Sequence, residues 1–405
     1  MDSAAALFID HCELSIASDH PGADMKTGWQ TKPLAEVCEF QRGLTYAKGD
    51  EVDVSENVVL RATNIDLATN LLDFAELKYI SDKVVVPDSK KVKKDSLMIC
   101  TASGSKSHLG KVAYIDDDYD YAFGGFMGMI TATTGLLPKY LFHLMTSDAY
   151  KDFIGALSDG ANINNLTFDN LKRFQVPYPP LSEQRRIVGI LDEAFEGLAT
   201  AKANAEQNLQ NARALFESHL HNGHAEKTPL GDLVNIKTGK LDANAAVEGG
   251  DYPFFTCSRE IFAIDEYAFD CEAILLAGNN AVGDFNVKHY KGKFNAYQRT
   301  YVITVNEKKR VLYRFLYFQM LKSLKKFKSQ SVGAGTKFLK LGMIKEMEIE
   351  LPNLAEQHRI VPTMDSIREE TQRLESLYQR KLAALDELKK SLLHRAFNGQ
   401  LIKDN

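Results

Sequence analysis

The chain lacks several features that would assign it to a membrane, secreted or metal-stapled class. It has 405 residues but no run of 18 apolar residues, so no transmembrane helix is predicted. Its start, MDSAAALFIDHCELS, lacks the basic segment and small-residue cleavage site of a signal peptide. The five cysteines have no CxxC spacing and are odd in number, which argues against a zinc site and a disulfide framework. We therefore expect reduced thiols and a cytoplasmic protein without a membrane partner.

Catalytic motifs are also missing. The phosphate-loop pattern GxxxxGK[ST] is absent, and AFGGF at 122–126 is too short for a cofactor loop and lacks its acidic follower. YPPL at 178–181 superficially resembles a methyltransferase motif, but Tyr178 replaces the polar residue that grips the adenine amino group. PDSK at 87–90 lacks the Asp/Glu-x-Lys of a nuclease at usable spacing. We expect a chain that binds and does not catalyse.

Two clusters leave a metal site open as an alternative. HLHNGH at 219–224 contains three histidines, but His and Asn-Gly are also typical of a helix C-terminus, and HRAFNG at 394–399 has the same form. The acidic residues of 116–120 are more typical of a solvated loop than of a magnesium site. We predict no metal in this chain.

The charge is unevenly distributed. The whole chain has a net charge of −5, yet residues 278–345 contain twelve Lys, three Arg and two acidic residues. Such asymmetry indicates a surface that faces a polyanion. The alternative is one solvated helix, because KSLKKFK at 322–328 supplies four of these lysines.

One phrase occurs twice. PLSEQRRIVGILDEA at 180–194 matches NLAEQHRIVPTMDSI at 353–367 with an offset of 173 residues, far longer than a solenoid period. Upstream, FQVPYPPL (174–181) aligns with MEIELPNL (347–354), and both alternate apolar residues like a half-buried strand. Residues 32–43 also resemble residues 228–239. In the middle of each repeat, residues 97–114 resemble residues 273–290, with 97 aligned to 273. Each repeat is therefore predicted to be a β-rich domain with a few helices and a Pro-marked exit.

A long helix is predicted after each phrase. Residues 182–221 contain no proline and would span roughly 60 Å. Apolar residues follow a heptad rhythm in both copies, with a polar residue at matching positions, which predicts two antiparallel helices that form a coiled coil. The first seam is Leu191, Ala194, Leu198, Ala201, Ala205, Asn208, Ala212 and Leu215; the second is Met364, Ile367, Thr371, Leu374, Tyr378, Lys381, Leu385, Leu388 and Leu392. Gly189 and Pro362 predict a bend between a short entry helix and the long helix.

The predicted fold class is α/β (α+β), with two similar domains separated by two long helices and an approximate two-fold symmetry. The predicted parts are an N-terminal extension (1–28), a first domain (29–180), a central helix (181–226), a second domain (227–352) and a distal helix (353–405). Paired readers of this kind bind DNA at two half-sites whose spacing is a geometric property of the protein.

The repeated phrase, together with LLAGNNAVGDF and FNAYQRTYVIT, resembles the specificity subunit of type I restriction–modification systems over about 29–402. The resemblance implies two target recognition domains, each of which reads one half of a bipartite site in double-stranded DNA. It also implies helices that fix the spacer and hold two adenine-methyltransferase subunits, joined by motor-nuclease restriction subunits. The cofactors S-adenosylmethionine, ATP and Mg would belong to these partners, and none to this chain.

DNA readout needs Arg, Lys, Asn or Gln at base edges and basic groups at phosphates. The candidate DNA-binding residues of the second domain are Asn279, Asn280, Lys291, Lys293, Gln298, Arg299, Thr336, Lys337 and Lys340. Those of the first domain are Ser103, Ser105, Lys106, Lys111 and the neighbouring His108. The alternative is that Asn279 or Gln298 satisfies turn backbone. The first domain is net acidic, so its partners are expected to supply much of its phosphate contact.

The repeated phrase also predicts two equivalent partner-binding sites. The residues kept in both copies are Glu183, Gln184, Arg186 and Ile187 in the first, and Glu356, Gln357, Arg359 and Ile360 in the second. The alternative is that the isoleucines pack each helix onto its own domain and the polar residues form local caps. Two further functions stay open: a scaffold or adaptor with a coiled-coil rod, and a self-contained restriction–modification enzyme, which the missing motifs oppose.

Overall fold

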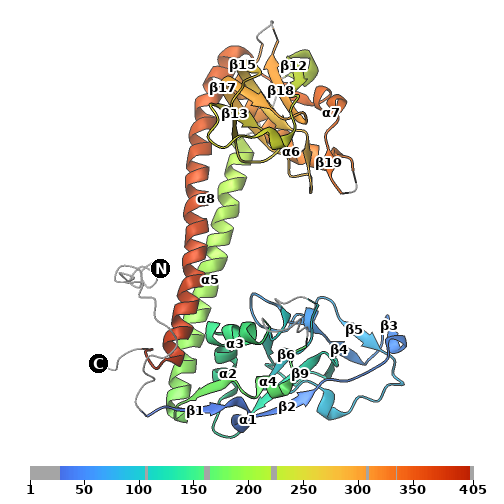
Figure 1. The fold of residues 1–405 in the computed structure, drawn as a ribbon, viewed down its shortest axis with the longest axis vertical. Helices are drawn as coiled ribbons and strands as arrows, with labels where there is room; N and C mark the ends of the chain where they lie inside the picture. Colours follow the sequence, from blue (N-terminus) through green and yellow to red (C-terminus); the bar gives the residue numbers. More distant parts are fainter. Residues whose placement is uncertain are drawn as a thin grey trace. The chain divides into compact units, whose positions relative to one another are not determined.

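The computed structural model describes residues 28–104, 108–158, 165–219, 226–306, 310–333 and 335–401. The chain divides into two compact units, one formed by residues 1–202 and 383–405 and the other by residues 203–382. Each unit contains one α/β domain and a part of each of two long helices (Figure 1).

The first domain is built on two four-stranded sheets, in the orders β2-β9-β6-β7 and β3-β5-β4-β8. Its first and last strands pair antiparallel, with Gln30 opposite Tyr178, so both ends of the domain meet at one place. Its elements are β1 (Gln30–Pro33), α1 (Leu34–Val37), β2 (Cys38–Arg42), β3 (Glu51–Val52), β4 (Val58–Leu60), β5 (Lys78–Ile80), β6 (Ser96–Cys100), β7 (Val112–Tyr114), β8 (Tyr121–Phe123), β9 (Met127–Ala132), α2 (Pro138–Thr146), α3 (Asp148–Ser158), α4 (Phe168–Leu171) and β10 (Gln175–Tyr178).

Strand β6 shows how the sequence divides the core of this domain. Leu97 and Ile99 pack into the cluster that contains α2 and α3, whereas Met98 and Cys100 pack into a second cluster with β4. Successive side chains of a strand point to opposite faces, so a strand buried on both sides is continuously apolar. Figure 1 shows α2 and α3 between this sheet and the long helices, and the first cluster extends to Leu191 and Phe397 of those helices.

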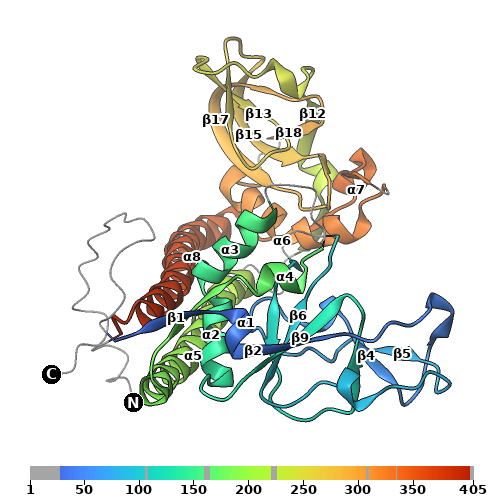
Figure 2. The same cartoon turned by 60° about the horizontal axis from the view of Figure 1, so that its bottom comes forward.

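The second domain has a curved six-stranded sheet in the order β12-β18-β15-β17-β13-β14 (Figure 2). Helix α6 packs on one face through Phe315 and Phe318, and Phe255 and Phe294 fill the other. Its elements are β11 (Glu226–Pro229), β12 (Val234–Thr238), β13 (Tyr252–Phe255), β14 (Phe262–Ile264), β15 (Phe269–Ala277), β16 (Asn279–Asn280), β17 (Val287–Ala296), β18 (Thr300–Val305), α6 (Tyr313–Gln330), β19 (Lys337–Phe338), α7 (Leu341–Lys345) and β20 (Glu348–Leu351).

The two domains repeat one topology. The strand order β2-β9-β6-β7 has its counterpart in β12-β18-β15-β17, and the terminal pair β1·β10 has its counterpart in β11·β20. A glycine follows β2 and β12 for the same reason: a Cβ atom on Gly43 would lie 1.9 Å from the carbonyl oxygen of Gly124, and one on Gly239 would lie 1.7 Å from that of Ala296. Only glycine allows this backbone approach.

The alignment predicted for 97–114 is wrong by one residue. The Cys100 and Ala277 amides donate to the Lys111 and Asn286 carbonyls, respectively, so β6 and β15 correspond at an offset of 177. Alternation along a strand makes such a slip important, because it exchanges the two faces of the sheet. The apolar residues on both faces hide it in the sequence.

The long helices are α5 (Leu181–His219) and α8 (Leu354–Phe397), and each is one continuous helix rather than the predicted short entry helix followed by a long one. Gly189 and Pro362 both lie inside a continuous helix on its exposed side. Proline removes one hydrogen bond to the carbonyl four residues earlier, here that of exposed His358, which water can satisfy. A glycine in a helix costs only about 1 kcal/mol.

The helices run antiparallel in each unit, but the predicted seam drifts. In the first unit Arg186 donates to the Leu401 carbonyl at 3.0 Å and Lys202 pairs with Asp386 at 3.2 Å. In the second unit Arg213 pairs with Glu375 at 2.7 Å. Four predicted seam residues, among them both polar ones, are exposed, and the next residue of each lies further inside. The pairs, exposed residue first, are Asn208 and Leu209, Leu215 and Phe216, Lys381 and Leu382, and Leu388 and Lys389.

Candidate nucleic-acid interface

The second domain gathers four of the predicted readers at one place. Strands β16 and β19 pair antiparallel, with Asn279 opposite Phe338 and Asn280 opposite Lys337. The turn before β18 lies beside them, because the Gly278 amide donates to the Arg299 carbonyl at 2.9 Å. The Arg299 guanidinium lies over the Phe338 ring, 5.3 Å from its centroid. This cation–π contact positions the guanidinium, and Arg299 is exposed, so its N–H groups can reach an acceptor.

The loop that follows β16 brings further positive charge to this group. A Cβ atom on Gly283 would lie 3.3 Å from Cγ of Lys328 and 3.5 Å from Cγ of Lys337, so both lysine stems flank this glycine. The nearby carboxylate of Asp284 is paired with Arg259 at 2.6 Å. The side-chain oxygen of Asn280 accepts the amides of Val282 at 2.9 Å and Asp284 at 3.0 Å, so that oxygen stabilises the turn.

The remaining predicted residues of this domain fall into two sets. Gln298, Thr336 and Lys340 are exposed and lie within two residues of Arg299 or β19 in the chain. Lys291 and Lys293 lie farther along β17, where the Lys291 ammonium is 3.7 Å from the Glu272 carboxylate and the Lys293 ammonium is 4.6 Å from the Tyr267 ring centroid. Lys291 is four residues beyond the start of β17, about 14 Å at the rise of a strand. The structure does not bring these two lysines to Asn279 and Asn280.

The first domain has the same backbone hydrogen bonds between its loops, here called the loop frame, but with other side chains. The Leu166 amide donates to the Thr101 carbonyl at 2.6 Å, as the Leu339 amide donates to that of Gly278 at 2.9 Å. Ser103 is half-buried and follows this frame directly. Ser105 and Lys106 lie outside the described residues. His108, half-buried, is the first described residue after that gap.

Lys111 lies in the same loop but is held by the protein itself. Its ammonium donates to the Ile65 carbonyl at 3.0 Å, and burial lowers the pKa of this lysine. This hydrogen bond occupies one of the three donors of the ammonium and holds the loop. The role of Lys111 in DNA binding stays a prediction.

Phe126 is a surface residue that the sequence reasoning missed. Its carbonyl accepts the Thr101 amide at 2.9 Å, the bond that Arg299 makes with Gly278 in the second domain. Its side chain is 73% exposed. The signal was available, because the offset of 173 between the repeated phrases also aligns Phe126 with Arg299.

The predicted partner-binding glutamines are buried anchors. Gln184 is 0% exposed; its side-chain oxygen accepts the Leu137 amide at 2.9 Å, and its amide donates to the carbonyls of Gly135 at 3.0 Å and Pro179 at 2.9 Å. Gln357, also 0% exposed, does the same with the Leu312 amide at 2.8 Å and two carbonyls, those of Arg310 at 2.9 Å and Pro352 at 2.8 Å. Neither side chain has surface to offer a partner.

Ile187 and Ile360 are buried too, in the clusters of their own units. The prediction that Gln184, Ile187, Gln357 and Ile360 contact a partner is therefore corrected. They pack each helix onto its own domain, the alternative that the sequence left open.

The charged members of the phrase are more accessible. Arg186 grips Glu183 at 2.8 and 2.9 Å, and Arg359 grips Glu356 at 3.0 and 2.6 Å, each through two hydrogen bonds within one helical turn. Arg359 is mostly exposed, whereas Arg186 is partly covered and also donates to the Leu401 carbonyl. Their role in partner binding stays a prediction.

A second pair of contacts joins each helix to its domain. The Asp192 carboxylate lies 2.8 Å from Nε2 of His143 and 2.7 Å from Nζ of Lys139, both on α2. The hydrogen bond with His143 is the main cause that lowers the pKa of Asp192 to about 2. In the second unit the guanidinium of Arg314 on α6 binds Asp365, 173 residues after Asp192, with Nε at 2.6 Å.

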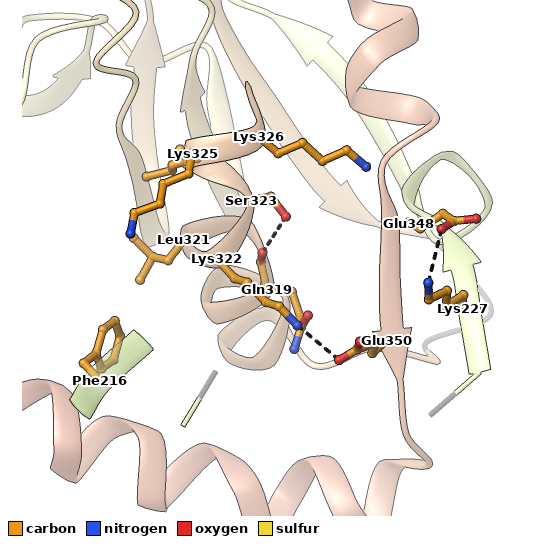
Figure 3. Close-up of a pocket in the computed structure, with 11 residues that line it drawn as sticks. Phe216, Lys227, Gln319, Leu321, Lys322, Ser323, Lys325, Lys326, Glu348 and Glu350 are labelled. Carbon is orange, nitrogen blue, oxygen red and sulfur yellow. Dashed lines mark hydrogen bonds and ion pairs between the residues drawn. The ribbon is translucent and has the colours of Figure 1, made fainter. Parts of the chain in front are cut away.

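A pocket of about 640 Å³ in the second unit is lined in part by lysines of the basic segment 278–345, among them Lys322 and Lys326 (Figure 3). Lys322 of α6 pairs with Glu350 at 3.1 Å, and Lys227 lies 3.9 Å from Glu348. At least one lysine of KSLKKFK is thus held inside the domain, away from a polyanion. Lys326 of this lining is exposed.

Other chemistry finds little support. Within the described parts of the chain, no group of three or more His, Cys, Asp or Glu side chains could hold a metal ion. The HLHNGH segment lies almost entirely outside them. Among the described helices, none is long and apolar enough to cross a bilayer. Tyr178 of the YPPL segment lies under the ammonium of Lys32, 4.0 Å from the ring centroid, where it stabilises the pairing of β1 with β10.

The chain thus has two repeated α/β domains, each anchored to long antiparallel helices, and one domain carries a polar and basic group of loops. These features define a class of paired-domain recognition proteins. Comparison with known proteins gives the family. The model of the type I restriction modification DNA specificity domain matches residues 26–210 and 223–381. The chain belongs to this family.

Its relatives agree. The chain is 38% identical over 175 residues to the EcoDI specificity subunit of Escherichia coli, a match that covers 43% of this chain and 38% of that protein. It is 25% identical over 416 residues to the StySPI specificity subunit of Salmonella potsdam, covering 92% of this chain and 89% of the relative.

Solved structures share the fold. A chain from work on complex assembly and conformational transition of the type I R-M system matches with a TM-score of 0.73 at 19% identity, covering 94% of this chain and all of the other. The HsdS subunit from Thermoanaerobacter tengcongensis matches with a TM-score of 0.53 at 18% identity, covering 94% and 99%. These likenesses establish the α/β architecture of two similar domains and two long helices.

Proposed function

We propose that this chain is the DNA-reading subunit of a type I restriction–modification complex and that each domain reads one half of a bipartite site. The observation that carries the proposal is the repeated loop frame, in which the same backbone hydrogen bonds present different side chains in the two domains. Arg299 and Gln298 stand in one domain where Phe126 and Gly125 stand in the other. Two readers with one frame and two sets of side chains suit two different half-sites.

The chain recognises DNA, and its partners perform the chemistry. Two adenine-methyltransferase subunits would bring S-adenosylmethionine, and motor-nuclease subunits would bring ATP and Mg. Glu183 with Arg186 and Glu356 with Arg359 remain the proposed contacts to the methyltransferases, because each pair reaches the surface at an equivalent place. Reversing both charges at the more exposed pair, Glu356→Arg with Arg359→Glu, keeps the local ion pair. In native mass spectrometry this variant should bind one methyltransferase subunit instead of two. An intact two-to-one complex would show that the pair only stabilises the helix.

Exchange of one domain tests the reading function. Residues 29–180 are replaced by the first domain of another family member, and methylated adenines are mapped in cells that carry the hybrid. Only one half-site should change. If both halves change together, each domain does not read by itself. If purified chain and methyltransferase show no sequence-specific DNA binding at all, the scaffold or adaptor function takes its place.

The helices are proposed to set the spacer. Inserting four residues after Asn208 adds about 6 Å of helix and rotates the remainder of α5 and the second domain by about 40°. We expect the spacer to lengthen by about one base pair with both half-sites unchanged. Two residues would turn the helix by about 200° and abolish activity. An unaltered spacer in the four-residue variant would assign the spacing to the partner subunits.

A further inference from the structure

The turns before β9 and β18 are equivalent. The Met127 amide donates to the Gly124 carbonyl at 2.8 Å, and the Thr300 amide donates to the Tyr297 carbonyl at 2.8 Å. A parallel bridge joins Leu44 to Gly124 in one domain and Leu241 to Tyr297 in the other. The central residues of these turns are Gly125–Phe126 and Gln298–Arg299.

The two turns carry opposite chemistry. Gln298 and Arg299 offer several hydrogen-bond donors, which suit the polar edges of guanine or adenine. Gly125 has no side chain, and Phe126 offers only an apolar ring. The position facing each turn is exchanged as well: Phe338, which lies under Arg299, has Asn165 as its counterpart at the offset of 173.

Phe126 is held on a rigid base with its ring outside. Its carbonyl accepts the Thr101 amide and the Thr101 hydroxyl, both at 2.9 Å, and the Ala102 amide at 3.2 Å. The next residue, Met127, is 1% exposed and fixes the start of β9. A large ring held 73% exposed by a fixed backbone gains from burial against a partner surface.

We propose that Phe126 is a specificity-determining residue that packs on the 5-methyl group of a thymine in the first half-site. This deepens the proposed function and rests on it. Thymine is the base with an apolar group at its major-groove edge, and phenylalanine is one of the side chains that contact it. The first domain would thus read one base by apolar contact at the position where the second domain reads by hydrogen bonds.

Removal of one methyl group from the DNA tests this directly. The complex of this chain with its methyltransferase is used, and the half-sites are first established by mapping methylated adenines. Duplexes then carry deoxyuridine in place of each thymine of the first half-site, one at a time. One such replacement should weaken binding by the wild-type complex by about three- to tenfold. The same replacement should leave binding by Phe126→Ala unchanged, because the contact is already lost.

Two variants control for folding and for general apolar character. Val85→Ala removes another side chain of the first domain that is 83% exposed and should not alter binding. Phe126→Leu keeps an apolar group and should restore part of the sensitivity to the thymine methyl. Phe126→Ala should leave recognition of the second half-site intact.

Two results would overturn the inference. These are equal binding by Phe126→Ala and wild type, or a loss in Phe126→Ala without any position sensitive to deoxyuridine. In each case sequence-specific binding and the result of domain exchange still stand. Absence of specific binding in the wild-type complex would instead remove the proposed function.

Discussion

Substitution of Gln184 should lower the stability of the protein more than substitution at most other positions. Gln184 is fully buried and satisfies one amide and two carbonyls of the first domain. Gln184→Ala leaves these three groups without their partner, at about 1–3 kcal/mol for each buried group. Because water can enter the space left by the side chain, we take the lower end and expect a loss of about 3 kcal/mol.

Denaturant unfolding of wild type and variants measures this loss, and hydrogen exchange locates it in the first unit. Gln357→Ala is the matched variant and should destabilise the second unit by a similar amount. Gln210→Ala, on the exposed side of α5, is the control and should change stability by less than about 0.5 kcal/mol. A loss below about 1 kcal/mol for Gln184→Ala would show that the helix is held by apolar packing alone.

A charge at this position gives a sharper test. Gln184→Glu keeps the acceptor for Leu137, but an ionised carboxylate would face the two carbonyl oxygens of Gly135 and Pro179. The pKa of this glutamate should therefore be raised above its unfolded value of about 4.3. Its protonated form donates to one of the two carbonyls, so the variant is closest to wild type below about pH 4 and loses up to about 1.4 kcal/mol per pH unit above that. Stability that is independent of pH would contradict the observed hydrogen-bond pattern.

Three further predictions concern other anchors and the reader. The hydrogen bond with His143 lowers the pKa of Asp192 to about 2 from an ordinary 3.8, so the stabilisation that the ionised Asp192 provides is present above about pH 4 and is lost towards pH 2. Asp192→Asn should remove this acid dependence, worth about 1 kcal/mol for a partly exposed group, as unfolding measured against pH would show. Gly239→Ala should destabilise by about 3 kcal/mol or more through a clash with a carbonyl oxygen, whereas Gly197→Ala, in open helix, should stabilise by up to about 1 kcal/mol, as thermal unfolding would measure. Lys337→Ala should weaken DNA binding at all sequences and reduce the slope of log affinity against log salt by about one, and a loss at one base position would make it a base reader.

The architecture could be predicted because the sequence contains an internal repeat. The repeated phrase marks where each helix begins, and the long proline-free stretch predicts α5 correctly. The predicted seam of α5 is wrong at Asn208 and Leu215, where Leu209 and Phe216 lie further inside, whereas Ala212 between them is buried as predicted. A straight helix has 3.6 residues per turn and drifts from a strict 3.5-residue rhythm, so some seam positions move to the next residue.

The site was predicted only in part, for a different reason. Loops are brought together by backbone hydrogen bonds, such as those of Gly278 with Arg299 and Leu339, and these leave no trace in residue type. The chemistry of Asn279, Arg299 and Lys337 could be named, but not that they meet while Lys291 lies elsewhere. Gln184 was misassigned because its partners are main-chain atoms up to 49 residues away.

Those main-chain partners have an evolutionary consequence. Each glutamine binds one main-chain amide and two main-chain carbonyls, which any residue supplies except that proline lacks the amide, and these hydrogen bonds involve no side chain of the domain. Substitutions in the domain therefore leave the joint intact as long as the backbone keeps its course. Recombination between genes can thus bring in a foreign domain with a different amino-acid sequence, and the helix will hold it as it holds its own. A lineage can exchange a domain without having to evolve the joint again.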